Sequence, residues 1–305
     1  MNNILTNIKS LELQTVKNLK NSKSSNTIRA YKSDFNDFSL FCSKNGFKSM
    51  PTQPKILSLY LTDLSSRSKY STLRRRLASI SIIHKLKGYY IDNKHPIIME
   101  NLMGIKRVKG SNQKGKKPLL INDLKIVIKA IGQSKEKEIK KIRDKALLLI
   151  GFSGGFRRSE LVNIENEDIE FVSEGVKIFI KRSKTDQSGE GMTKGIPYFN
   201  NNEFCPVIAL KNWINILEKK QNKIFNISDK SVALILKKYA NIAGLDSSKY
   251  AGHSLRSGFA TSTAESGAEE RTIMAMTGHK STEMVRRYIK EANLFKNNAL
   301  NKIKF

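Results

Sequence analysis

The sequence predicts a mainly α-helical (α+β) protein of two domains. At 305 residues the chain is long enough for two separate cores. Apolar residues recur every three or four positions along most of the chain, which is the period of helices that bury one face. Between residues 168 and 199 three short segments are rich in β-branched or aromatic residues and are separated by glycines, which predicts a small three-stranded antiparallel sheet. We expect an all-helical domain over residues 1–105, a linker over 106–118, and a mostly helical domain that holds the sheet over 119–305.

Four helices are expected in the first domain. Their starts follow Ser24 or Ser25 as an N-cap, Pro54, the neighbourhood of Ser71, and Pro96. Gly46 and Gly88 are typical C-terminal stops for the first and third helices. The expected inward faces are Ile28, Tyr31, Phe35, Phe38 and Cys42 in the first helix, Leu57, Leu61 and Leu64 in the second, and Leu73, Leu77 and Ile80 in the third.

The segment Lys106–Pro118 is expected to be a basic linker. It has six Lys or Arg residues and no apolar periodicity, so Lys116 and Lys117 are candidates for contact with a nucleic-acid duplex. Gly110–Lys116 superficially matches a phosphate-cradling loop. Nucleotide binding is rejected, because Lys117 replaces the required Ser or Thr and no strand precedes the loop.

The second domain should begin with two helices, continue through the sheet, and return to helices. The expected helices are Ile121–Ile131, Ile139–Phe152, Val207–Lys219, Ser228–Ala243, His253–Glu265, Ala268–Met276 and Ser281–Ala292. The expected strands are Asp168–Val172, Val176–Arg182 and Lys194–Phe199. Lys184 then lies in the loop between the second and third strands.

The charge balance indicates a polyanionic partner. The chain has 55 Lys and Arg against 27 Asp and Glu, a net charge of +28, which favours nucleic acid. A proteome rich in Lys and Asn is the alternative source of part of this charge. A membrane surface is disfavoured because no amphipathic basic stretch is present, and no long apolar run or signal peptide is evident. With only Cys42 and Cys205, a reducing, cytoplasmic location is expected.

Several polar residues stand out by position, although each alone has an ordinary structural explanation. Arg157 follows Gly154-Gly155 at a helix start, where backbone amides and a guanidinium suit an anion. Glu160 lies on the same side of that helix, and either orients Arg157 or only complements the helix dipole. The other candidates are Lys184, His253 and Arg256 at i and i+3, His279 in a Gly-His pair, and Tyr288 in the following helix.

The Arg74-Arg75-Arg76 triplet must fan around the third helix, so part of it faces outward. It is either a solvated face or a set of phosphate contacts, and in so basic a chain the second reading is favoured. His84 and His95 are expected to be structural or exposed.

The whole set resembles the tyrosine recombinase (phage integrase) family. The order and spacing of Arg157, Lys184, His253-x-x-Arg256, Gly278-His279 and Tyr288 carry the resemblance, which covers nearly the whole chain. Residues 27–31 look like the opening helix of that family's core-binding domain, and residues 117–120 like the entry to its catalytic domain. One departure is Arg158, which stands where the family usually has an aliphatic residue and could compete for the role of Arg157.

The resemblance implies roles for these residues. Tyr288 would attack a DNA phosphorus, leaving a 3′-phosphotyrosyl link and a free 5′-hydroxyl, and strand exchange would pass through a Holliday junction. Arg157 and Arg256 would hold the non-bridging oxygens. His253 would assist proton transfer from the tyrosine, His279 would hydrogen-bond the phosphate, Lys184 would protonate the leaving oxygen, and Glu160 would support Arg157. No ATP, metal or other cofactor is expected.

The resemblance also implies partners. The two domains would clamp double-stranded DNA, with a monomer or dimer on one site and a tetramer on synapsed sites. The tail, residues 294–305, would pack on a neighbouring protomer; alternatively it docks on its own domain or frays as a chain terminus. Two other functions remain open: a type IB topoisomerase, which uses the same tyrosine chemistry, and a DNA-binding protein with an inactive site.

Overall fold

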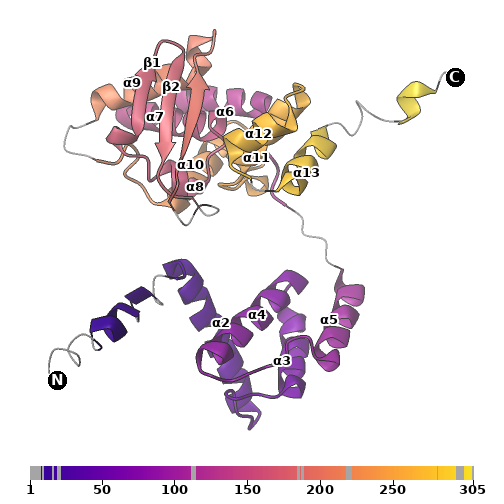
Figure 1. Cartoon of the computed structure of the whole chain (residues 1–305). Coiled ribbons are helices and arrows are strands. Elements are labelled where there is room, and N and C mark those ends of the chain that lie inside the picture. The colour runs from indigo at the N-terminus through magenta and orange to yellow at the C-terminus, as the bar shows by residue number, and fades with distance from the viewer. Residues whose placement is uncertain are drawn as a thin grey trace. The chain divides into compact units, whose positions relative to one another are not determined.

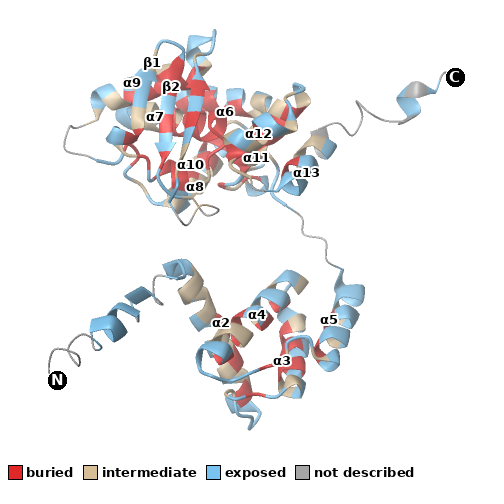
Figure 2. Cartoon of the chain, in the orientation of Figure 1, coloured by how far each residue is buried: buried red, intermediate tan, exposed pale blue. Residues whose placement is uncertain are grey.

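The computed structural model describes two compact units, residues 1–114 and 115–305, each with its own hydrophobic core (Figures 1 and 2). The described residues are 8, 10–15, 17–18, 22–110, 115–183, 186, 189–217, 222–279, 281–292 and 299–303. Both units are mainly helical, and the second holds one three-stranded antiparallel sheet. The predicted fold class is therefore confirmed. Within those ranges no helix has the length and apolar character needed to cross a membrane.

Helices of the N-terminal unit pack their apolar stripes around one core. The helices are α2 (Ser25–Lys44), α3 (Pro54–Arg67), α4 (Tyr70–Leu86) and α5 (Pro96–Lys109). Ser24 caps α2, since its side chain accepts a hydrogen bond from the Thr27 amide at 3.3 Å. The buried members of the core include the predicted Phe38, Cys42, Leu57, Leu61, Leu64, Leu73, Leu77 and Ile80.

The linker is shorter than expected at both ends. Helix α5 continues to Lys109, past the expected start of the linker at Lys106, because Ile105 still packs against the core and the chain turns only at Gly110, where φ is +71°. At the other end, the Lys117 amide bonds the Lys249 carbonyl at 2.8 Å, so this residue is already part of the C-terminal unit.

The sheet of the C-terminal unit has the order β1-β2-β3, with β1 (Ile169–Val172), β2 (Gly175–Ile180) and β3 (Met192–Pro197). In the antiparallel register of β2 and β3, Ile178 lies opposite Lys194. Strand β3 begins and ends two residues earlier than the predicted Lys194–Phe199. The chain turns at Gly191, where φ is +75°, and enters the sheet directly at Met192.

Helices pack around this sheet and continue beyond it (Figure 1). They are α6 (Ile121–Gln133), α7 (Glu138–Ser153), α8 (Arg158–Leu161), α9 (Pro206–Ile216), α10 (Asp229–Ile242), α11 (Ser254–Glu265), α12 (Glu270–Thr277) and α13 (Thr282–Ala292). Helix α7 is buried along its whole second half (Figure 2) and contacts α9 and α11. Helices α11, α12 and α13 share a small core around Ala260, Ile273 and Val285.

Single 3₁₀ turns complete the unit at Asn166–Asp168, Asn202–Phe204, Ser247–Lys249 and Ala299–Lys302. Two predictions concern residues outside the described ranges: the position of Lys184, and that of most of the tail, including Phe295. Both stay predictions.

Candidate active site

Arg157 is presented by a tight turn at the end of α7. Gly155 adopts φ +54°, and a side chain there would meet the Phe259 ring at 3.0 Å, so only glycine fits without strain. Arg157 is the N-cap of α8, and Glu160 holds it twice: one carboxylate oxygen accepts from the Arg157 amide at 2.9 Å and the other from Nη1 at 2.5 Å. Because Glu160 is buried and held in place by its surroundings, this ion pair fixes the position of the Arg157 guanidinium.

Arg256 enters the same site from the first turn of α11. It is buried, with Nη1 donating to the Gly155 carbonyl at 2.9 Å and Nη2 lying 3.1 Å from His279 Nε2. Burial lowers the pKa of Arg256 to about 10, with added repulsion from Arg157, while Glu160 acts in the opposite direction. The guanidinium is therefore charged at neutral pH and lacks a carboxylate of its own within the described residues, a state that an anion would relieve.

His279 follows α12, which ends at Gly278 in the left-handed conformation. Its Nδ1 lies 2.7 Å from the Thr277 hydroxyl, and that hydroxyl donates to the Ile273 carbonyl at 2.6 Å. The hydroxyl proton is thus committed, so Nδ1 must carry the ring proton and Nε2 presents its lone pair to Arg256. Burial, followed by repulsion from Arg256, lowers the pKa of His279 to about 4, which agrees with a neutral ring.

Tyr288 lies on α13 beside this group. Its ring centre is 6.3 Å from that of His279, and its half-buried side chain packs against the α11–α12–α13 core. Arg157 reaches toward the same place, with Nη2 3.5 Å from the Gly278 carbonyl. His253 is the exposed N-cap of α11, three residues before Arg256. The structure thus brings Tyr288 next to two arginines and a histidine from four separate segments.

Tyr250, a second tyrosine close in sequence to His253 and Arg256, is placed very differently from Tyr288. It is buried, and its hydroxyl donates to Asp123 at 2.8 Å. Burial and this carboxylate both raise its pKa. These contacts give Tyr250 a structural role inside the unit.

Arg158, the residue that departs from the family pattern, leans away from the site. Its aliphatic stem crosses Gly252, where any side chain would collide with it, and its guanidinium is 3.9 Å from Asp229. Arg157, by contrast, turns toward Gly278 and Glu160, so the two arginines do not compete for one position.

Sequence reasoning missed Lys194. It lies on β3 with its side chain buried, its ammonium bonded to the Gly154 carbonyl at 2.7 Å, directly behind the turn that presents Arg157. The signal was available: Met192, Lys194 and Ile196 alternate inward on β3, and a lysine at an inward strand position is unusual. Because the strand was expected to start at Lys194, this residue was read as a strand end.

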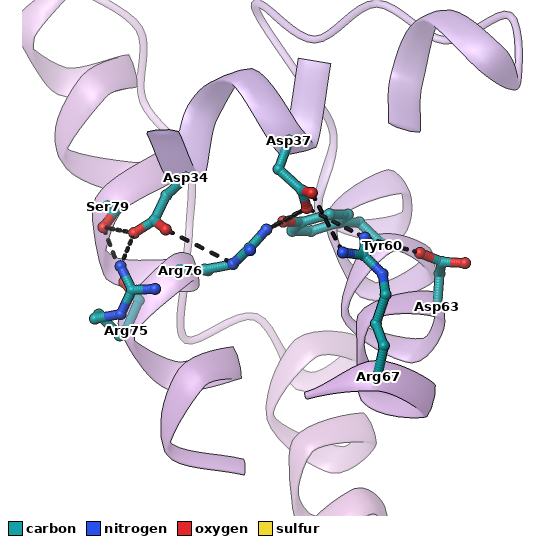
Figure 3. A network of polar contacts seen from close by, with 8 residues as sticks. All are labelled: Asp34, Asp37, Tyr60, Asp63, Arg67, Arg75, Arg76 and Ser79. Carbon is teal, nitrogen blue, oxygen red and sulfur yellow. Dashed lines mark hydrogen bonds and ion pairs between the residues drawn. The ribbon is translucent and has the colours of Figure 1, made fainter. Parts of the chain in front are cut away.

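The arginine triplet of the N-terminal unit separates into different roles, and Figure 3 shows the contacts of two of its members, Arg75 and Arg76. Arg76 is largely buried in a network: it pairs with Asp37 and Asp34 and donates to the Tyr60 hydroxyl at 2.7 Å, and that hydroxyl donates to Asp37 at 2.7 Å. Burial opposes the charge of Asp37, but hydrogen bonds from Arg67 and Tyr60 outweigh it and lower its pKa. Arg76 therefore joins α2, α3 and α4.

The other two members of the triplet face solvent. Arg75 is half-exposed and pairs with buried Asp34, while Arg74 is exposed and makes no ion pair with any residue that the structure describes. In the second unit, Lys116 donates to the Ser248 carbonyl at 2.7 Å and Lys117 pairs with Asp123 at 2.9 Å. Of the five predicted DNA contacts, Arg74 is the most available.

Comparisons with known proteins identify the family of this chain. The phage integrase family model matches residues 124–294. An integrase/recombinase xerD homolog from Selenomonas ruminantium is 41% identical over 98% of this chain and 91% of its own length. A tyrosine recombinase XerC from Syntrophus aciditrophicus (strain SB) is 26% identical, covering 91% of each chain.

Solved structures show the same fold. A XerH site-specific recombinase bound to a palindromic difH substrate has a TM-score of 0.65 at 19% identity, covering 86% of this chain and 77% of its own. A lambda integrase dimer bound to a COC′ core site has a TM-score of 0.60 at 16% identity, covering 97% and 98%. With the family model spanning more than half of the chain and a relative of this similarity along nearly its full length, the chain belongs to the phage integrase family and is a tyrosine recombinase.

Proposed function

We propose that this recombinase cuts and rejoins double-stranded DNA at a specific site by attack of Tyr288 on a backbone phosphorus. The phenol oxygen forms the new bond to phosphorus, the bond to the 5′-oxygen breaks, and a 3′-phosphotyrosyl link remains. The observation that carries this proposal is the convergence of Arg157, Arg256 and His279 beside Tyr288. The covalent link conserves the energy of the phosphodiester, so rejoining requires no ATP.

Two fixed guanidiniums suit the charge that develops on the non-bridging oxygens. Arg157 is held by Glu160 and Arg256 by the Gly155 carbonyl, so neither must reorganise when phosphate arrives. An ordinary tyrosine has a pKa of about 10 and is a weak nucleophile until its proton is removed. We assign that step to His253, and protonation of the leaving 5′-oxygen to Lys184.

His279 must change state for its proposed role. Its Nε2 presents a lone pair to Arg256, and a lone pair cannot donate to a phosphate oxygen. Binding of the phosphate would therefore place a proton on Nε2, either by charging the ring or by moving the proton from Nδ1. The negative phosphate favours the charged ring, since it offsets the repulsion from Arg256 and Arg157.

Duplex DNA is the proposed partner because the chain carries a net charge of +28 and its structural relatives were solved on DNA. Lambda integrase has been solved as a dimer on a core site and as a tetramer on a Holliday junction. We extend both states to this chain: a monomer or dimer on one site, and a tetramer on synapsed sites in the cytoplasm.

Strand exchange between two duplexes tests the proposal against its alternatives. The target duplex is first selected by binding from a random pool. We expect recombinant products only from duplexes that carry the selected site, together with a four-subunit complex on a native gel. Relaxation of a supercoiled plasmid that lacks the site would instead support a type IB topoisomerase, and binding without any adduct or exchange would support an inactive DNA-binding protein.

Arg74 and Arg76 provide a matched pair for testing DNA contact in the N-terminal unit. Arg74→Ala should weaken binding a few-fold and reduce the slope of log affinity against log salt by about 1, with unchanged thermal stability. Arg76→Ala should lower the free energy of unfolding by about 2 kcal/mol, because it leaves Asp34 and Asp37 with fewer partners. Salt titrations and thermal melts of both variants measure this. An unchanged salt slope for Arg74→Ala would remove it from the interface.

A further inference from the structure

Lys194 occupies a core position of β3. Its side chain is 1% exposed, and its neighbours on the inward face of the strand are Met192 and Ile196. Opposite it on β2 lies the fully buried Ile178. An apolar residue would fill this position at no electrostatic cost, whereas a buried amine loses its hydration. Some other property of the amine must therefore account for a lysine here.

The amine holds the turn that presents Arg157. Lys194 Nζ donates to the Gly154 carbonyl at 2.7 Å, and Arg256 Nη1 donates to the next carbonyl, that of Gly155, at 2.9 Å. Side chains from β3 and α11 thus hold successive carbonyls of one turn. Arg157 follows two residues later, so a shift of this turn moves the guanidinium.

The charge of this amine depends on its surroundings. Among the described residues, no carboxylate lies within 4.0 Å of the Lys194 amine. The charged or titratable groups that face the amine come from three places in the unit: Arg157 and Glu160 at α8, Arg256 on α11, and His279 after α12. Burial lowers the pKa of Lys194 to about 7; Glu160 opposes this shift, and the two arginines add to it. An amine with a pKa this close to neutral gains a proton when an anion enters the site, because the negative charge raises its pKa.

We propose that Lys194 is a positioning residue of the phosphate site, holding the Gly154–Gly155 turn through its amine and taking up a proton from solvent as the scissile phosphate binds. The uptake replaces a neutral amine by a third fixed cation, behind the two arginines, at the moment when negative charge arrives. It also strengthens the bond to the Gly154 carbonyl, since a charged donor bonds more strongly than a neutral one. This inference rests on the proposed role of Tyr288, Arg157 and Arg256.

Lys194 is unsuited to the role of the acid assigned to Lys184. Its amine is directed at a backbone carbonyl, stands 4.3 Å from the centre of the Phe156 ring, and is closed off from solvent. A substrate with sulfur in place of the leaving 5′-oxygen separates the two roles, because a thiolate leaves without protonation. Loss of Lys194 should slow cleavage equally on the oxygen and sulfur substrates.

The test compares Lys194→Met with Lys177→Met in the full-length protein. Lys177 lies on the neighbouring strand β2 but is half-exposed, so its loss should change neither stability nor cleavage. Lys194→Met should slow adduct formation on a nicked duplex by about 10²-fold, because the arginine is displaced. The same variant should melt several degrees higher at pH 6.5, because a charged buried amine is gone.

The pH dependence gives a second readout. Because the pKa of Lys194 is lower in the fold than its ordinary 10.5, its burial destabilises the protein fully at and below about pH 7, and the penalty fades toward pH 10.5. The increase in melting temperature of Lys194→Met over the wild-type protein should therefore be largest at and below about pH 7 and disappear toward pH 10.5. At subsaturating DNA, where the rate reports the free protein, the ratio of wild-type to variant cleavage rates should be largest at low pH and fall above about pH 7, since the protonated amine is the active form. In the protein without DNA, the pKa of His279 is lowered to about 4 by burial and by repulsion from Arg256, so this ring does not contribute to the change in melting temperature in that window.

Lys194→Gln guards against a methionine variant that fails to fold, since it keeps an uncharged N–H donor at this position, on a shorter side chain. It should retain more activity than Lys194→Met and lose the same pH dependence. The inference is wrong if either variant cleaves at the wild-type rate. It is also wrong if Lys194→Met melts at a lower temperature than the wild-type protein and the ratio of their cleavage rates does not change with pH. The wild-type adduct is the reference throughout: if the wild-type protein forms none, the proposed function fails instead.

Discussion

Tyr288→Phe should bind the target duplex with nearly wild-type affinity and form no covalent adduct. The substitution removes one oxygen from a half-buried ring that packs against the α11–α12–α13 core, so the fold and the DNA surface are preserved. Without the phenol oxygen there is no atom to bond to phosphorus, and cleavage should be lost entirely rather than slowed. Denaturing gels of a nicked duplex, whose broken strand diffuses away after attack and prevents religation, measure this.

Tyr250→Phe is the matched control. Its hydroxyl bonds to Asp123 inside the unit, so the variant should lose some stability but still form the adduct. Adduct that persists in Tyr288→Phe and disappears in Tyr250→Phe would reverse the assignment.

Lys184→Ala should slow cleavage by several orders of magnitude on an ordinary duplex. An alkoxide is a poor leaving group, so the 5′-oxygen needs a proton as its bond to phosphorus breaks. A substrate with a 5′-bridging sulfur should restore most of the rate, since a thiolate leaves readily without one. Rates of adduct formation on both substrates, with and without excess EDTA, make the comparison, and chelation should leave all of them unchanged.

The sulfur substrate decides between two roles for Lys184. Rescue of the alanine variant identifies an acid. An equal defect on oxygen and sulfur would mean that Lys184 contributes binding or position, as we infer for Lys194.

Local sequence patterns predicted most of the fold because periodicity reports burial directly. The apolar stripe from Phe35 to Cys42 and the N-cap at Ser24 placed α2 within a residue of its observed start. The β3 boundaries were wrong by two residues, since the chain turns at Gly191 and enters the sheet directly at Met192. Helix α5 extends past the expected start of the linker, because Ile105 continues the apolar stripe into a charged segment.

The sequence predicts which residues belong to the candidate site, but not their ion-pair partners, their exposure or their protonation. Nothing in the sequence indicates that Arg76 is committed to Asp34 and Asp37 while Arg74 is exposed, because their partners lie on other helices. The proton position on His279 depends on the Thr277 hydroxyl and the Ile273 carbonyl, which only the folded α12 brings together. Lys194 was overlooked because its side chain is buried only if the inward face of β3 is the one that holds Met192 and Ile196, and the expected strand bounds do not show this.

Mapping the DNA-linked residue tests the central claim most directly. After trapping on a nicked duplex, digestion with trypsin should leave DNA attached to the short peptide 288–290, because cleavage follows Arg287 and Lys290. Mass spectrometry of the nuclease-trimmed product should place the phosphate on Tyr288, joined to a 3′-nucleotide, with a free 5′-hydroxyl on the other fragment. Attachment at any other residue, or a 5′-linked phosphate, would contradict the proposed mechanism.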